Sequence, residues 1–236
     1  MKYNPIILQE ITMKKIIGTF LLLMFLIPIG WAQPLAGDFR TRQSGNWNDA
    51  NTWESYNGST WATAMNAPEV AGTYTIEVQS GHTITLSTTA DTTEATVSIT
   101  INGTVRNTAV TVKPFKATIT VNGTYEHAIN GGALPIATWN DGSLCSVTGV
   151  TTNAGSAALN YSQNFHDFIW DCPSQSTNVT LYWNNITITG DVKILAAGSS
   201  SYQLRLTEKT LSNGNFTIDG NLECSAAGKI YSVKCN

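Results

Sequence analysis

The stretches that decide the fold are ITINGTV at residues 99–105 and ITVNGTY at residues 119–125. Each follows the order apolar, Thr, apolar, polar, Gly, polar, apolar, and this order recurs in ITITGDV at 186–192 and FTIDGNL at 216–222. A weaker copy, CSVTGVT, begins at Cys145. Because successive side chains of a strand point to opposite sides, each copy predicts a strand with one aliphatic face and one face of Thr and Asn. We expect the glycine where the chain bends out of the strand, since Gly tolerates a positive φ.

The copies recur at the spacing of a solenoid. We mark the position of each copy by its glycine, and in the segment FIWDC by the cysteine that stands in the glycine's place. The mean spacing between successive markers is about 23 residues. One copy per coil predicts a right-handed parallel β-helix, with about six coils over residues 96–222. The markers are Gly103, Gly123, Gly149, Cys172, Gly190 and Gly220. Stacking in register is expected to bury Ile99, Ile119, Ile186, Phe216 and Leu222 and to leave outside Thr100, Thr120, Thr187 and Thr217.

A β-sandwich is the alternative all-β architecture. In a sandwich, Asn102-Gly103 and Asn122-Gly123 would be two-residue hairpin turns, and the strands on either side of each turn would pair antiparallel. Against this alternative, the same seven-residue order recurs in the same phase with roughly a full coil between copies. The repeat therefore favours the β-helix over the sandwich.

The composition agrees with an all-β protein. Hydrophobic residues make up 42% of the 236 residues and charged residues only 12%. A chain rich in Thr, Asn and Gly suits strands and turns, which excludes a helical bundle or coiled coil, and it is too hydrophobic for a disordered tail. The formal net charge is −3, and no basic run follows the first 32 residues. Nucleic acid is therefore not an expected partner.

The N-terminal residues have the pattern of a secretory signal peptide. Two lysines follow Met13, an apolar run covers residues 16–29, and Gly30-Trp31-Ala32 places small residues before a cleavage site. The run of about 14 residues is too short to span a bilayer, which needs about 20. We expect the true start at Met13, a signal peptide that ends at residue 32, and no membrane span after its removal. The expected location is secreted or on the outer cell surface.

Residues 33–73 lack the repeat and carry Trp47, Trp53 and Trp61 at short intervals. A solenoid needs an atypical terminal unit to cover its first coil, so this region is expected to be a Trp-rich N-terminal cap. The coils then occupy residues 74–236, and we expect them to continue in a longer protein. The alternative is an aromatic platform for sugar rings, which makes the three tryptophans candidate ligand-binding residues. The cap is favoured because large aromatic side chains are more often packed than displayed.

The four cysteines do not form a metal-binding pattern. Export would place them in an oxidising compartment, where Cys224 and Cys235 can form a disulfide across a short loop. Cys145 and Cys172 lie in apolar segments and are equally well explained as small buried side chains. The sequence has no CxxC pair, no Cys/His cluster and no EF-hand, Walker or dinucleotide motif. No metal and no cofactor is therefore expected.

Several segments resemble those of secreted surface proteins of the Bacteroidetes. They are the run SGNW…NTWE…STW…P followed by SGHTITL, then NGTYEHAINGGALPIATWNDGSLCSVTGV, NFHDFIWDCPSQ, ITITGDVKI and LRLTEK. Together they cover most of residues 37–222. The resemblance implies a long, adhesin-like parallel β-helix, commonly followed by a C-terminal sorting domain for type IX secretion. No such domain occurs within these 236 residues, in keeping with a fragment.

The acidic residues do not predict a catalytic site. Asp167 and Asp171 share one face of a strand roughly 13 Å apart, whereas a glycosidase pair needs about 5–9.5 Å. Asp191 and Asp219 fall on later coils, and no nucleophile and base can be paired with the three histidines. The expected function is a secreted or cell-surface structural or adhesive module that contacts glycans or surface proteins. The alternative is the N-terminal part of a carbohydrate-active β-helix enzyme, a polysaccharide lyase or a glycosidase.

Overall fold

The computed structural model describes residues 33–68, 72–87, 97–109, 117–153, 155, 159–207, 216–225 and 229–231. The chain divides into two units, Met1–Pro34 and Leu35–Asn236, and the fold below is that of the second. The expected signal peptide and Cys235 lie outside the described residues. Within those residues the second unit consists of strands and turns, with one short 3-10 helix, η1 (Ala50–Thr52).

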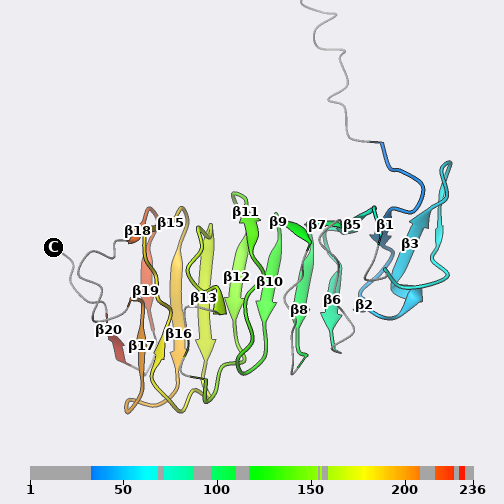
Figure 1. Ribbon diagram of the computed structural model, residues 1–236. Helices are drawn as coiled ribbons and strands as arrows, with labels where there is room; N and C mark the ends of the chain where they lie inside the picture. The colour runs from blue at the N-terminus through cyan, green and yellow to red at the C-terminus, as the bar shows by residue number, and fades with distance from the viewer. Residues whose placement is uncertain are drawn as a thin grey trace, which may run out of the picture. The chain divides into compact units, whose positions relative to one another are not determined.

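Two long sheets run along the unit (Figure 1). The eight-stranded sheet is parallel throughout and contains, in spatial order, β2 (Gly45–Asn46), β6 (Thr83–Leu86), β8 (Thr104–Asn107), β10 (Thr124–His127), β12 (Leu144–Val147), β13 (Asp167–Cys172), β16 (Val192–Ala197) and β19 (Leu222–Cys224). The parallel part of the seven-stranded sheet contains β1 (Phe39–Thr41), β5 (Thr75–Val78), β7 (Ser98–Ile101), β9 (Thr118–Val121) and β11 (Ala137–Trp139).

Two short parallel sheets and an antiparallel extension complete the fold. The antiparallel extension adds β3 (Trp53–Tyr56) and β4 (Trp61–Thr63) to β1. One short sheet contains β14 (Val179–Thr180), β17 (Gln203–Arg205) and β20 (Lys229–Tyr231), and the other contains β15 (Ile186–Ile188) and β18 (Phe216–Ile218).

From β5 to β12, consecutive strands alternate between the two long sheets, so the chain winds as a β-solenoid. β7 pairs with β5 and β9, whereas β8, which follows it in the chain, pairs with β6 and β10. Asn102-Gly103 is therefore a corner between two sheets and not a hairpin turn. The parallel β-helix is confirmed over the sandwich, with about five turns where the sequence predicted about six.

The glycines of the two Asn-Gly corners, Gly103 and Gly123, are required by the close approach of successive coils. A Cβ on Gly123 would meet the backbone oxygens of Asn102 and Gly103 on the preceding coil. Neither Gly103 nor Gly123 has a positive φ, unlike Gly81 at 81° and Gly142 at 80°. The sequence thus predicted the position of the bend correctly, but it attributed the glycine to a positive φ. At these two corners the glycine is needed because a side chain would collide with the preceding coil.

Two of the repeat markers are out of phase. Cys145 lies on β12, which pairs with β10, so CSVTGVT matches the second strand of the coil and Gly149 is not equivalent to Gly123. FIWDC forms most of β13, which pairs with β12, so Cys172 is not at the corner either. The strand that pairs with β9 is β11, and the corner after it contains Gly142. Residues 140–143 form this corner, two residues more than Asn122-Gly123, and the longer corner hides the repeat.

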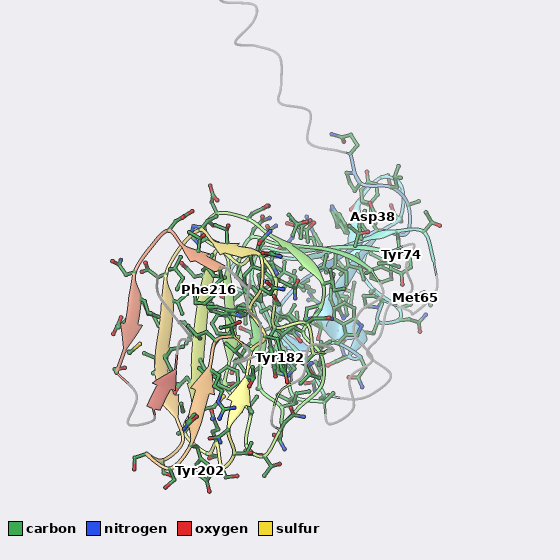
Figure 2. The ribbon with its side chains drawn as sticks, turned by 60° about the vertical axis from the view of Figure 1, so that its left-hand side comes forward. Asp38, Met65, Tyr74, Tyr182, Tyr202 and Phe216 are labelled. Atoms are coloured by element: carbon green, nitrogen blue, oxygen red, sulfur yellow. The ribbon has the colours of Figure 1, made fainter. Side chains whose placement is uncertain are left out.

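The predicted aliphatic face lies inside the solenoid, and the Thr face lies outside. Ile99, Ile119 and Ile186 are buried. Phe216, labelled in Figure 2, is partly buried and packs against the core. The outward residues Thr100, Thr120 and Thr187 are partly exposed and Thr217 is exposed. Leu222, predicted to be buried, is 49% exposed, because β19 is an edge strand among the described residues.

The N-terminal region joins both long sheets at the first coil. β1 pairs in parallel with β5, and β2 pairs in parallel with β6. Trp47 and Trp53 lie beneath this region with their ring centroids 5.0 Å apart, and Nε1 of Trp53 donates a hydrogen bond to the carbonyl of Trp47 at 2.7 Å. The aromatic pair belongs to the buried core, and the assignment of this region as a terminal cap stays a prediction.

Candidate functional site

Of the three tryptophans offered by the sequence as a sugar platform, only Trp61 lies at the surface. Trp47 and Trp53 are 2% and 0% exposed, so their rings cannot stack against a ligand. Trp61 begins β4 and is partly exposed. A surface site in this region must therefore be built around Trp61 and the strands beside it.

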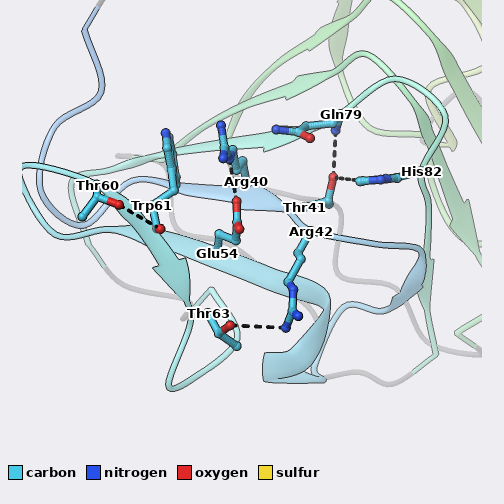
Figure 3. Close-up of polar contacts among 9 residues, drawn as sticks. All are labelled: Arg40, Thr41, Arg42, Glu54, Thr60, Trp61, Thr63, Gln79 and His82. Atoms are coloured by element: carbon cyan, nitrogen blue, oxygen red, sulfur yellow. Dashed lines mark hydrogen bonds and ion pairs between the residues drawn. The ribbon is translucent and has the colours of Figure 1, made fainter.

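Strand pairing brings polar and aromatic side chains to the same outer face as Trp61. Glu54 pairs across with both Arg40 and Thr63, and Tyr56 pairs with Trp61. Residues two apart in a strand share a face, so these side chains belong to one side of the three strands. Figure 3 shows Arg40 and Glu54 in contact beside Trp61. We call this set of side chains, together with Arg42, which donates to Thr63, the meander patch; it comprises Arg40, Arg42, Glu54, Tyr56, Trp61 and Thr63.

Close contacts hold the meander patch in one arrangement. Nε of Arg40 donates to Oε2 of Glu54 at 2.8 Å, and Cζ of Arg40 lies 4.4 Å from the centroid of the Trp61 ring. The rings of Tyr56 and Trp61 have centroids 5.3 Å apart at an angle of 53°. The ion pair fixes the guanidinium plane over the indole, where the cation–π attraction adds to it.

The charges of the meander patch and its neighbours balance. Arg40 lies between Glu54 on β3 and Glu77 on β5, which is its register partner on the other side. Arg42 donates from Nη1 to Oγ1 of Thr63 at 3.2 Å. Two arginines and two glutamates therefore lie on or beside these neighbouring strands. Aromatic rings surrounded by paired donors and acceptors can hold a ligand by stacking and by hydrogen bonds.

The outer face of the seven-stranded sheet continues from the meander patch as rows of hydroxyl groups. The register sets Glu77 beside Thr100, followed by Thr120 and Thr138. A second row contains Thr75, Ser98 and Thr118. Apart from Glu77, these outward positions are uncharged.

An amide ladder follows the corner at the edge of this face. Nδ2 of Asn102 donates to Oε1 of Glu77 at 2.8 Å, Nδ2 of Asn122 donates to Oδ1 of Asn102 at 2.7 Å, and Nδ2 of Asn140 donates to Oδ1 of Asn122 at 2.6 Å. Each coil is thus tied to the one before it through its corner side chain. The sequence placed Asn102 and Asn122 outside but gave no indication that they bond to each other.

The aspartates near the other corners bind backbone groups of the next coil. Oδ1 of Asp167 accepts from the backbone N–H of Asp191 at 2.7 Å, and Oδ1 of Asp191 accepts from the backbone N–H of Asn221 at 2.8 Å. The latter bond lowers the pKa of Asp191 from its ordinary value. Nδ1 of His166 lies 3.3 Å from Oδ1 of Asp167. Among the described residues, no group of three or more His, Cys, Asp and Glu side chains is placed to hold a metal ion.

The buried titratable groups have the properties of core residues. Nε2 of His127 bonds to the carbonyl of Gly131 at 2.8 Å, and burial lowers the pKa of His127 to about 4. Burial raises the pKa of Cys172 to about 12 and that of Cys145 well above its ordinary value. Both thiols are therefore protonated, which makes them poor nucleophiles. Cys224 on β19 is exposed, and its disulfide with Cys235 stays a prediction.

Comparison with protein-family models, with curated proteins and with solved structures found no match. No helix in the described part of the chain is long and apolar enough to cross a membrane. The fold and the chemistry of its outer face are therefore the grounds for a functional proposal.

Proposed function

We propose that this chain is a structural module of a secreted or cell-surface protein, and that its outer face contacts glycans or other surface molecules. The observation that carries the proposal is the outward face of the seven-stranded sheet. This face presents rows of Thr and Ser hydroxyls that begin at the meander patch. A stacked parallel sheet keeps such groups at a regular spacing of about 4.8 Å between strands, which suits contact with an extended partner.

The alternative is the N-terminal part of a polysaccharide lyase or glycosidase. Such an enzyme would need clustered acids on its outer face. Asp167 and Asp191 instead accept hydrogen bonds from the backbone of the next coil, which gives both a structural role. The structural and adhesive proposal is favoured because the outer face of the seven-stranded sheet carries rows of hydroxyls, and because the acids Glu126 and Glu223 on the eight-stranded sheet are paired with Arg106 and Lys193.

The proposal includes export to the cell surface. The charge pattern of residues 1–32 supports a signal peptide, and the resemblance to Bacteroidetes surface proteins supports carriage by type IX secretion in a longer chain. N-terminal analysis of the exported protein is expected to find Gln33 at the mature end. An intracellular, unprocessed product would contradict this part of the proposal.

A binding and turnover assay tests the function directly. The exported chain is applied to a glycan array and to soluble polysaccharides, and the polysaccharides are then analysed for shortened products. Retention on glycans with no shortened product supports the adhesive module. Release of oligosaccharides would establish the enzyme instead, and the absence of both retention and cleavage would overturn the contact with glycans.

A further inference from the structure

We propose that the meander patch binds neutral glycans, with Tyr56 and Trp61 stacking against the sugar and Arg40 and Glu54 bonding to its hydroxyls. This inference rests on the proposed function, because it gives the glycan contact a defined site and a ligand class.

The aromatic half of the site is the pair Tyr56 and Trp61. Trp61 is the one tryptophan outside the buried core among the six in the described residues. Both rings are partly exposed, and their centroids are 5.3 Å apart. One face of the indole is covered by Arg40, so a sugar ring would contact Tyr56 and the uncovered part of Trp61. Large, partly open aromatic surfaces supply apolar contact at a low cost in conformational entropy.

The loop between these two residues is held rigidly. Oδ1 of Asn57 accepts from the backbone N–H of Ser59, from its hydroxyl and from the backbone N–H of Thr60, each at 3.0 Å. The hydroxyl of Thr60 donates to the carbonyl of Trp61 at 3.1 Å. The aromatic pair is thus positioned before a ligand arrives, which reduces the entropy lost on binding.

The polar half of the site is the ion pair of Arg40 and Glu54. The pair uses Nε of Arg40 and Oε2 of Glu54. Within the described part of the chain, the terminal amino groups of Arg40 and Oε1 of Glu54 are left for a ligand. Two planar donors beside a carboxylate acceptor match two adjacent hydroxyls, each of which both donates and accepts. Arg42 and Thr63 extend this set of donors and acceptors along the same face.

The charge balance selects the ligand class. An anionic sugar would gain from Arg40 but would lie close to Glu54, whose carboxylate is 2.8 Å from Nε of Arg40, and to Glu77 on the neighbouring strand. The whole chain also has a formal net charge of −3. A neutral polyhydroxylated ligand meets no such repulsion, whereas an acidic polysaccharide does.

Affinity electrophoresis of the exported chain tests the site. The probes are neutral polysaccharides (xylan, mannan and soluble cellulose derivatives without charge) and acidic ones (polygalacturonate and dextran sulfate). Trp61→Ala and Tyr56→Ala are each expected to weaken binding of a neutral polysaccharide at least tenfold. The matched control is Tyr202→Ala, since Figure 2 shows Tyr202 on the opposite side of the unit from Met65 and Asp38, which flank the meander.

The possible results separate this inference from the proposed function. Far-UV circular dichroism verifies the fold of each variant, and Tyr56→Ala serves alone if Trp61→Ala unfolds. Neutral binding lost in both variants and kept in Tyr202→Ala supports the site. Wild-type affinity in the folded patch variants, or binding of acidic polysaccharides alone, overturns the inference while the glycan contact stands. No binding of any polysaccharide overturns both.

Discussion

Placing an aspartate at Val121 should unfold the coils, whereas placing one at the adjacent Thr120 should be tolerated. Both residues lie on β9. Val121 is 0% exposed, and its register partners are Ile101 on one side and Trp139 on the other. Neither partner offers a free hydrogen-bonding group, because Nε1 of Trp139 already donates to Gln163.

The magnitude follows from these surroundings. Removing the Val121 side chain forfeits about 1.5–3 kcal/mol of apolar burial, and an unpaired buried carboxylate adds several kcal/mol more. Together these terms approach the roughly 5–15 kcal/mol by which domains are stable. At Thr120 the new carboxylate faces water between Thr100 and Thr138, so we expect a change of about 0.5–1 kcal/mol.

Urea unfolding followed by tryptophan fluorescence measures the difference. Val121→Ala is the volume control, and it should cost about 2 kcal/mol without introducing a charge. We expect Val121→Asp to lose far more than this control or not to fold at all. Equal losses for Val121→Asp and Thr120→Asp would refute the assignment of the two faces.

Three further changes test other parts of the fold. Because burial lowers the pKa of His127 to about 4 from an ordinary 6.5, its contribution to stability is complete above about pH 6.5 and falls by about 1.4 kcal/mol per pH unit as the pH drops towards 4. In urea titrations at pH 7 and 4.5, His127→Gln should reduce the difference in the free energy of unfolding between the two pH values. An unchanged difference would contradict the assignment of this pH dependence to His127. Asn122→Ala removes two ladder bonds and should lower stability by about 1–2 kcal/mol in thermal melts; no change would show that the ladder adds nothing. Gly123→Ala should cost more than Gly81→Ala, since an alanine at residue 81 has only its positive φ against it, whereas at residue 123 the methyl group collides with backbone of the preceding coil; the reverse order in the same melts would count against the stacked corners.

The strand faces were predictable because they depend on local alternation. Ile99 and Thr100 are adjacent, and the pleat alone assigns them to opposite sides. The reason for the corner glycine was not predictable, since the clash at Gly123 arises from the preceding coil. The phase of the middle coils was also missed, because the corner at residues 140–143 is two residues longer than Asn122-Gly123 and the strand pairing that reveals it is nonlocal.

The candidate site was predictable only in part. The sequence singled out Trp61 but gave it the same standing as Trp47 and Trp53, because burial depends on the packing of the whole cap. The approach of Arg40 and Glu54 comes from the antiparallel pairing of β1 and β3. Alternation in RTR at 40–42 and WESY at 53–56 was the available signal, although it does not specify which strands pair.

Disulfide cross-linking between successive coils tests the central claim most directly, namely that the Asn-Gly turns are corners of a parallel stack. Thr100 and Thr120 are register partners on the outer face of β7 and β9, at a strand spacing of about 4.8 Å that a disulfide can span. We predict that the pair Thr100→Cys and Thr120→Cys oxidises readily and that mass spectrometry finds the linked peptides. The hairpin alternative instead places residue 100 opposite Val105. Failure of the 100–120 link, together with ready oxidation of Thr100→Cys with Val105→Cys, would contradict the parallel stack.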